Sequence, residues 1–430
     1  MLLLSTRAAQ AGNDDEFFVG NAAAISAGAV VGTVDDASST WYNPAGLGRD
    51  GRGHIDVSGT AYTLRFYFAP QLLRATTGES EDASISEFIA IPSQIAYSRG
   101  LGRGVTLGLG YFSPQGSNLK LRESLRVYDA GAESALQVAL GITRSLQILA
   151  AGLGFPLSRR VRLGFSLIGT YETEAESTSI FALRGEDGRQ TEFASSSALS
   201  TFSRIGLEAG IGFQFDLGES FILGVSARSP RALVTQEIDA SVSVGVARED
   251  AGVAAQILEP SEAVSGIHAL RAGRAVIGLS FRPAPGSFIA GEVSVEPGIY
   301  NLAAGIERKT VVNGRIGGLY RLSEVFSIGG GIFSDRSPDP DRPDPIAANG
   351  DFYGASLGVE IRDRHLLAAK EASDSMVLST VLAFRYAFSS GDINAIVMDP
   401  TPGSSGTLSA APGHLTVHET SLYFGGGVTF

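Results

Sequence analysis

The chain of 430 residues has no cysteine and only five histidines. The absence of cysteine excludes disulfide scaffolds, thiolate metal sites, iron–sulfur clusters and cysteine nucleophiles. Basic residues are also few, because 33 Lys and Arg stand against 45 Asp and Glu, which gives a formal net charge of −12. A nucleic-acid partner needs clustered Lys and Arg on the protein surface. The charge balance therefore argues against binding to nucleic acid.

Long apolar runs and charged residues are scarce as well. No stretch approaches the roughly 18 uninterrupted apolar residues that a membrane-spanning helix needs. Only 18% of the residues are charged, whereas about 25% is usual for a soluble protein. Glycine, by contrast, occurs 54 times. The composition excludes a helical membrane protein and is a poor match to an ordinary cytosolic enzyme.

No catalytic, metal or nucleotide motif is recognisable in the sequence. The histidines lack the surroundings of a Ser-His-Asp hydrolase. The aspartates between residues 335 and 344 lack the spacing of a calcium loop and are interrupted by prolines. A G-x-x-x-x-G-K-[ST] run is absent, so nothing indicates nucleotide-driven transport. We therefore predict no enzymatic activity, no catalytic residues, no metal and no cofactor.

The first residues resemble the end of an export signal. Met1–Leu4 is apolar, and Ala9-Gln10-Ala11 followed by Gly12 matches an A-x-A signal-peptidase site. We interpret residues 1–11 as a residual signal peptide. A disordered tail is the alternative.

From His54 onward, apolar and polar residues alternate with period two, which is the pattern of β-strands. Val161, Leu163 and Phe165, for example, alternate with polar or small neighbours. The alternating segments are about 10 to 15 residues long, whereas a globular strand has about 5 or 6 and a tilted transmembrane strand roughly 9 to 11. Fourteen such segments begin near residues 54, 87, 103, 143, 160, 200, 220, 272, 287, 311, 324, 351, 375 and 414.

The connections between these segments alternate in length. Short turns are expected at 100–102, 157–159, 218–219, 284–286 and 322–323, with a slightly longer one at 363–374. Longer polar loops are expected at 69–86, 114–142, 177–199, 230–271, 301–310, 336–350 and 389–413. This asymmetry and an even strand count are typical of an outer-membrane β-barrel with both termini in the periplasm. A large soluble β-sandwich is the alternative, but its strands are shorter.

The end of the chain supports the barrel. Leu422, Phe424, Gly426 and Val428 share one face of a strand with the terminal Phe430. This arrangement resembles the carboxy-terminal signature of bacterial outer-membrane barrels, which the barrel-insertion machinery reads. Pairing of this strand with the first one would leave no edge exposed to lipid.

A separate segment precedes the first strand. Residues 12–53 are rich in Ala and Gly and do not alternate. A barrel of 14 strands is too wide for its own side chains to fill, so we predict a compact plug (12–53) inside an all-β barrel (54–430). A disordered periplasmic tail is the alternative, which Trp41, Tyr42 and Leu47 disfavour.

Within this segment, residues 33–47 read TVDDASSTWYNPAGL. They resemble the hatch of the FadL/TodX/OmpP1 family of long-chain fatty-acid and hydrophobic-compound transporters. Weaker similarities follow in the family's order at LGLGYFSPQG (107–116), GVSARSP (224–230) and IGGGIFSDRSPDP (328–340). The resemblance extends from about residue 20 to the end of the chain.

The resemblance implies a 14-stranded barrel, closed by an N-terminal hatch, through which hydrophobic molecules cross the outer membrane without an energy source. It also implies that solutes leave the barrel laterally, through an opening in the wall beside a kinked third strand. The resemblance assigns the hatch gate to Asn43, Pro44, Ala45 and Gly46. It assigns the lateral opening to Gly108, Gly110 and Pro114. Glycine inside a strand marks a bend and proline cannot donate to the ladder, although ordinary packing of small residues is the alternative.

Two further groups of residues are candidates for binding the solute. The resemblance implies an apolar capture groove in the stretch 114–142, which is polar here. The apolar residues available to line it are Leu119, Leu121, Leu125, Val127 and Tyr128. Arginines on the predicted lumen face could hold a carboxylate head group, and the candidates are Arg162, Arg274 and Arg315. Pairing of these arginines with lumen acids is the alternative.

Together these features predict a channel for passive uptake of hydrophobic solutes in the outer membrane of a Gram-negative bacterium. Its expected partners are a hydrophobic small molecule, outer-membrane lipid and the barrel-insertion machinery, with no nucleic acid. Two alternatives remain open. One is a diffusion porin for small polar solutes, and the other is a structural barrel that binds partners through its loops.

Overall fold

The computed structural model describes residues 18–49, 53–129, 131–186, 189–248, 252–258, 269–301, 306–339, 350–363, 376–401 and 408–430. The predicted signal residues 1–11 and the first residues of the predicted plug lie outside this part. Within the described ranges, no helix is both long and apolar enough to cross a membrane.

Strands make up most of the described chain, as the period-two alternation predicts. The long strands are β1 (His54–Ala75), β2 (Ser80–Gly102), β3 (Val105–Asp129), β4 (Ala132–Pro156), β5 (Val161–Glu186), β6 (Arg189–Asp216), β8 (Arg231–Arg248), β18 (Val377–Met398) and β19 (Leu408–Thr429). The shorter strands are β7 (Phe221–Arg228), β9 (Gly252–Leu258), β10 (Ala269–Arg271), β11 (Arg274–Phe281), β12 (Phe288–Glu296), β13 (Ile299–Asn301), β14 (Ile306–Arg308), β15 (Val311–Arg321), β16 (Phe326–Asp335) and β17 (Asp351–Asp363).

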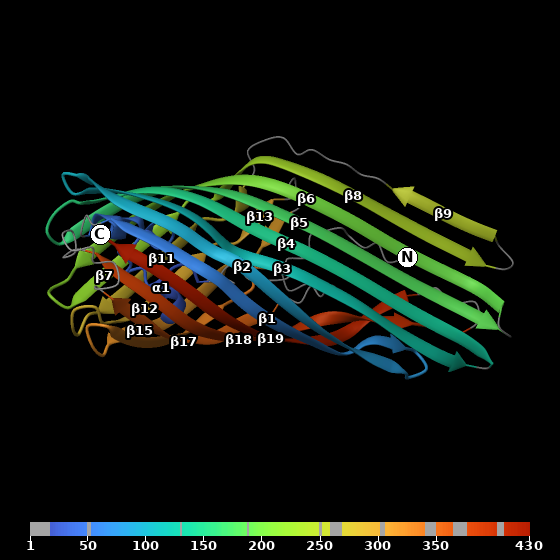
Figure 1. The fold of residues 1–430 in the computed structure, drawn as a ribbon. Coiled ribbons are helices and arrows are strands. Elements are labelled where there is room, and N and C mark those ends of the chain that lie inside the picture. Colours follow the sequence, from blue (N-terminus) through green and yellow to red (C-terminus); the bar gives the residue numbers. More distant parts are fainter. Residues whose placement is uncertain are drawn as a thin grey trace.

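All of these strands except β13 and β14 join one sheet, which closes on itself as a barrel (Figure 1). The first strand pairs antiparallel with the last, from His54 opposite Thr429 to Phe68 opposite Thr416. The backbones of Gly53 and Phe430 exchange two hydrogen bonds of 2.9 Å at the seam. The predicted pairing of the first and last strands is therefore confirmed.

The strand count differs from the prediction. Fifteen strands lie in the ring, so the expected count of 14 is not confirmed. The difference arises beside β6, whose two parts pair with two successive strands, β7 and β8. The chain leaves the sheet briefly at Ser229 and Pro230 between them, because proline has no N–H for the ladder.

Several stretches predicted to be loops are strands, so that part of the prediction is wrong. Residues 69–86 and 114–142 continue the hairpins β1–β2 and β3–β4, and 177–199, 230–271 and 389–413 likewise belong largely to strands. In the second half of β3 most inward side chains, such as Leu119 and Leu121, are apolar, whereas the outward Lys120 and Arg122 are charged and exposed. The outward charges led to the prediction of a loop, although the inward residues keep the alternation of a strand.

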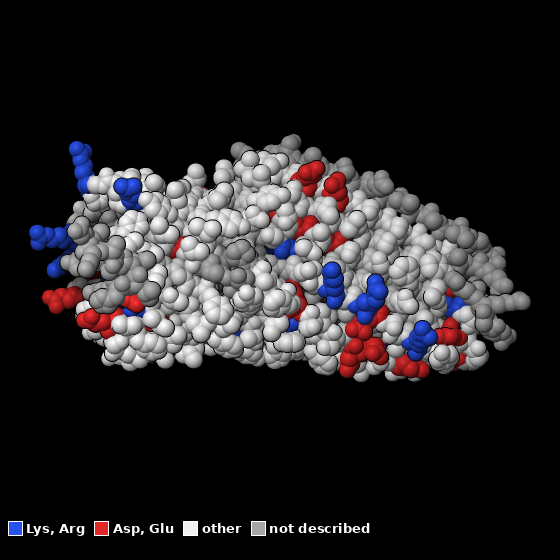
Figure 2. Space-filling model, viewed as in Figure 1, with Lys and Arg blue, Asp and Glu red and all other residues white. Residues whose placement is uncertain are grey.

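The outer surface carries large apolar side chains that no protein group covers. Leu167 is 59% exposed, Leu149 67% and Ile316 58%. Figure 2 shows few charges over the middle of the half that contains the chain's C-terminus, and more charges at that end and over the far half. An apolar band between polar zones is the surface that a bilayer requires of a barrel.

Residues 18–49, hereafter the N-terminal segment, lie inside the ring. The segment contains α1 (Asn21–Ile25), α2 (Ser39–Tyr42) and the 3-10 helix η1 (Pro44–Gly48). Helix α1 contacts β15 to β19, whereas α2 and η1 contact strands among β3 to β6 on another part of the wall. The segment therefore bridges the lumen, near the end where the C-terminus lies (Figure 1). We call this the turn end and the opposite one the far end.

Candidate functional site

A row of wall glycines makes room for the N-terminal segment. Gly154, Gly164 and Gly212 are neighbours in register on β4, β5 and β6. A Cβ on Gly164 would lie 2.1 Å from the carbonyl carbon of Pro44, and one on Gly212 would lie 1.9 Å from Oδ1 of Asn43. Only glycine permits such a close approach of two backbones. We did not predict these residues; an inward glycine at one height on three neighbouring strands is the signal that could have revealed them.

Asn43 holds η1 against the barrel wall through both the oxygen and the nitrogen of its side-chain amide. Oδ1 accepts a hydrogen bond from the N–H of Ala45 at 3.2 Å, which caps the start of η1. Nδ2 donates to the carbonyl oxygens of Val31 at 2.8 Å and Phe213 at 3.1 Å. One asparagine therefore connects η1, another part of the N-terminal segment and the wall strand β6.

The remaining predicted gate residues are buried next to Asn43. Pro44 begins η1, and Ala45 is fully buried behind it. A Cβ on Gly46 would lie 2.1 Å from the carbonyl oxygen of Val34, so this position also requires glycine. The structure thus brings the four predicted gate residues together at the barrel wall, whereas their role as a gate remains a prediction.

Other wall strands hold the rest of the N-terminal segment. The carboxylate of Glu292 on β12 accepts hydrogen bonds from the N–H groups of Val30 at 3.1 Å and Val31 at 3.0 Å. Tyr423 on β19 donates its hydroxyl to Oδ1 of Asn21 at 3.0 Å. Polar groups that are buried without a partner destabilise the fold. These hydrogen bonds replace those that the buried groups would otherwise make to water.

Two charged groups are partly removed from water by the packing of the segment, namely Asp36 within it and Arg228 on the wall. Burial raises the pKa of the Asp36 carboxyl above its ordinary value, and hydrogen bonds from the N–H and hydroxyl of Ser38 oppose that shift. The guanidinium of Arg228 lies 3.7 Å from the ring centroid of Trp41, a distance that suits a cation–π contact.

Ion pairs line the lumen. They include Arg65–Glu419, Arg144–Glu172, Arg231–Glu208, Arg271–Glu296, Arg315–Glu292 and Arg385–Glu419. Their side chains are buried, and buried charges need such partners. Within the described residues, no group of three or more His, Cys, Asp or Glu side chains could hold a metal ion.

The three arginines predicted to bind a head group have protein partners. Arg162 makes two hydrogen bonds to Asp216, at 2.9 and 2.6 Å. Arg274 donates to Ser294 at 3.3 Å. Nη1 of Arg315 lies 3.7 Å from Oε1 of Glu292. This geometry favours the alternative, pairing within the lumen, and binding of a head group by these residues remains a prediction.

The barrel wall separates between β2 and β3. Among the described residues, their ladder runs from Gly102 opposite Val105 to Gln94 opposite Phe112 and continues no further. Beyond that point β2 still pairs with β1, and β3 still pairs with β4. We call this separation, between residues 80–93 of β2 and 113–129 of β3, the wall break.

A β-bulge on β3 lies at the start of the wall break. Phe112 pairs with Ile148, but the next pair joins Gln115 to Leu146, so β3 contains one extra residue there. The bulge contains Pro114, which cannot donate to a ladder. It also exchanges the two faces of the strand: even-numbered residues face inward before it, and odd-numbered ones after it.

The two glycines predicted with Pro114 have separate surroundings. A Cβ on Gly110 would lie 2.3 Å from the ring of Phe112, which is fully buried. A Cβ on Gly108 would lie 2.6 Å from a methyl of Thr40 in the N-terminal segment. Gly110 therefore makes room for the aromatic ring beside the break, and Gly108 makes room for α2.

An apolar cluster fills the barrel interior at the far end, beside the wall break. Four of the five predicted groove residues belong to it, whereas Tyr128 is 71% exposed on the opposite face of β3. The other large members include Leu72, Leu73, Leu136, Val138, Leu140, Ile142, Ile180, Ile393, Ile396 and Met398. The tip of β1 closes over the cluster and pairs in parallel with β18, Leu73 opposite Ile396.

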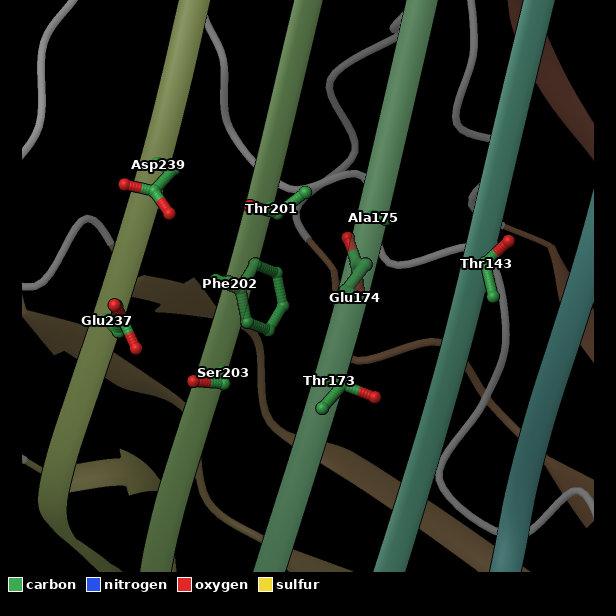
Figure 3. A pocket seen from close by; sticks show the side chains of 9 residues that line it. All are labelled: Thr143, Thr173, Glu174, Ala175, Thr201, Phe202, Ser203, Glu237 and Asp239. Atoms are coloured by element: carbon green, nitrogen blue, oxygen red, sulfur yellow. The ribbon is translucent and has the colours of Figure 1, made fainter.

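A pocket of about 360 Å³ in the wall has a different character (Figure 3). Its lining comes from β4, β5, β6 and β8 and includes the acids Glu174, Glu237 and Asp239, several hydroxyl groups and one ring, Phe202. Figure 3 shows the two acids of β8 beside the hydroxyls of β6. Such a polar lining is a poor place for an apolar solute.

Comparisons with known proteins show which fold this is. No protein-family model and no curated sequence matches the chain. A solved FadL homologue of Pseudomonas aeruginosa matches with a TM-score of 0.60 at 12% identity, covering 96% of this chain and 99% of that one. The chain has the FadL-type barrel fold. Two toluene transporters match with TM-scores of 0.55: TbuX of Ralstonia pickettii (12% identity, 96% and 98% covered) and TodX of P. putida (10% identity, 97% and 99% covered).

The FadL-type fold agrees with the resemblance that residues 33–47 carry. The match spans nearly the whole chain. These structural neighbours are transport proteins and not enzymes.

Proposed function

We propose that this FadL-type barrel is an outer-membrane channel for passive uptake of hydrophobic solutes, such as long-chain fatty acids, related lipids or hydrocarbons. One observation carries the proposal: the N-terminal segment bridges the lumen near the turn end, while the wall is broken between β2 and β3, next to an apolar cluster. A solute that cannot continue along the axis leaves through the wall into the bilayer. TbuX and TodX are toluene transporters, which agrees with this class of solute.

In this proposal the far end faces outward and both termini are periplasmic. Residues 1–11 are a residual export signal, and residues 12–53 are the hatch. The fifteen strands of the ring count as 14 wall positions in this proposal, with β7 and β8 taken together as one position beside β6. Outer-membrane lipid surrounds the apolar band, and the insertion machinery recognises the terminal strand through Phe430.

The apolar cluster is the entry site in this proposal. Leu119, Leu121, Leu125 and Val127 are buried there, and an apolar solute that replaces their mutual contacts gains a similar environment. The bulge at Pro114 lies between this cluster and the fully buried Phe112. The solute then moves downhill into the membrane, so the route needs no energy source.

A diffusion porin for small polar solutes is the second candidate. The ion-paired lumen favours it, because charged side chains on the inner wall suit a polar solute better than an apolar one. The N-terminal segment opposes it, since α1 and η1 contact different parts of the ring.

Uptake by vesicles with lipopolysaccharide in the outer leaflet tests the proposal, because apolar solutes cross that leaflet slowly without a channel. We expect a labelled long-chain fatty acid or toluene to enter and a small sugar to be excluded. Replacement of Asn43-Pro44-Ala45 by three glycines should change apolar uptake. Sugar entry without any preference for apolar solutes would instead identify a porin.

A further inference from the structure

We propose that Glu87 is the positioning residue that holds β3 beside β2 across the wall break. This inference rests on the proposed function in one respect, namely that the break is the exit for solute. The geometry of the contact itself is independent of what passes. Neither the resemblance to known transporters nor the sequence motifs point to this residue.

The contacts of Glu87 span three strands. Its side chain points into the lumen from β2 and is 2% exposed. Oε1 accepts hydrogen bonds from the hydroxyl of Ser117, at 2.9 Å, and from the backbone N–H of Asn118, both on β3. Oε2 accepts one from the hydroxyl of Tyr67 on β1, at 2.9 Å. One carboxylate therefore bridges the place where the ladder between β2 and β3 is missing.

A basic partner fixes the carboxylate from the β1 side. Arg65 Nη1 lies 3.7 Å from Oε2 of Glu87 and donates to the carbonyl oxygen of Gly116 on β3, at 3.5 Å. Hydrogen bonds that involve a charged group are about twice as strong as neutral ones. Residues 116–118 of β3 have no backbone pairs with β2. The side chains of Glu87 and Arg65 hydrogen-bond to them instead.

The same arginine continues the contacts toward the N-terminal segment. Arg65 Nε lies 2.5 Å from Glu419, which also pairs with Arg385. The guanidinium of Arg385 lies 5.3 Å from the ring centroid of Phe18. A continuous series of contacts therefore connects the N-terminal segment to Glu87 at the wall break.

Side chains suit a part of the wall that must separate and close again. A backbone ladder opens only by losing successive hydrogen bonds, whereas a carboxylate can leave its partners by a rotation about its side-chain bonds. Removal of Glu87 should therefore widen the break while β3 and β4 stay paired.

The absence of cysteine allows this to be measured with introduced spin labels. We would place one pair across the break, at Phe88→Cys on β2 and Lys120→Cys on β3, since both side chains are exposed. A control pair at Lys120→Cys and Thr143→Cys spans the intact ladder of β3 with β4. Distances would be measured by double electron–electron resonance in the full chain, reconstituted in lipid.

The test variant is Glu87→Ala, and the matched control is Glu208→Ala. Glu208 is also a buried acid, paired with Arg231 at 2.5 Å, but it lies on β6 away from the break. We expect Glu87→Ala to shift the distance across the break to longer values and broaden it. The β3–β4 distance should stay unchanged, and Glu208→Ala should alter neither distance. An unchanged distance across the break in Glu87→Ala overturns the proposal.

A milder variant covers the case in which Glu87→Ala fails to fold. Ser117→Ala removes one donor and leaves the N–H of Asn118 in place, so it should shift the same distance by a smaller amount. No shift in folded Ser117→Ala, when Glu87→Ala does not fold, also overturns the proposal. If the break widens as expected but no variant, nor the unmodified protein, takes up apolar solute, the role of Glu87 stands and the proposed function falls.

Discussion

Nδ2 of Asn43 donates a hydrogen bond of 3.1 Å to the carbonyl oxygen of Phe213, which lies 170 residues further along the chain. Asn43 is fully buried, and its amide also donates to Val31 within the N-terminal segment. The wall strand and the segment thus share one side chain. The segment cannot move away from β6 without leaving a buried amide and a carbonyl unsatisfied, which makes its position in the lumen specific.

The first prediction concerns this amide. Asn43→Ala should lower the free energy of unfolding by about 1–3 kcal/mol, because it leaves buried polar groups without partners. It should also raise ion conductance in planar bilayers, since the segment then moves more freely. Urea unfolding and conductance are the measurements. Gln137→Ala, which removes an exposed amide from β4, is the control and should change neither. Equal conductance in Asn43→Ala and the unmodified protein would argue against a gate here.

The second prediction concerns the wall glycines. Gly164→Ala places a methyl group 2.1 Å from the backbone of Pro44, so either the wall or the segment must shift. Overpacking of this kind costs about 1–3 kcal/mol. Gly314→Ala is the matched control, because a Cβ there meets nothing within 4 Å. We expect lower stability in urea for Gly164→Ala alone, and equal stability of both variants would refute the close seating of the segment.

The third prediction concerns the apolar cluster. Leu121→Asp introduces a charge among buried apolar side chains and should reduce uptake of apolar solute at least several-fold, because the entry site becomes polar. Tyr128→Asp, on the opposite, exposed face of the same strand, should leave uptake unchanged. Initial rates in lipopolysaccharide-containing vesicles, normalised to folded protein, give the comparison. Loss of uptake in Tyr128→Asp only would place the entry site on the outer face.

Much of the fold could be predicted because barrel strands alternate strictly. Each expected start lies in or near an observed strand, as with 160 for β5, which begins at Val161, 311 for β15 and 351 for β17. The motif around Asn43 was likewise recognisable, since its residues are contiguous. Periodicity and local motifs were sufficient in these cases.

The wall break and its bridging residue could not be predicted in the same way. Glu87 is an ordinary acid in an alternating strand, and its partners Ser117 and Asn118 lie about 30 residues away. Only the register of β3 brings them together, and a single extra residue near Pro114 sets that register. Several strands were predicted to be loops for a related reason. Outside the apolar band both strands and loops carry charged residues, so charge does not distinguish them.

Deletion of Pro114 tests the central claim most directly. The deletion removes the extra residue of the bulge, so β3 can alternate without interruption and extend its ladder with β2. Uptake of a labelled apolar solute and of a small sugar would be compared between this variant and the unmodified protein in lipopolysaccharide-containing vesicles. Our account predicts that the unmodified protein admits only the apolar solute and that the deletion, in folded barrels, abolishes its entry. Undiminished apolar entry with a closed wall would contradict lateral exit between β2 and β3.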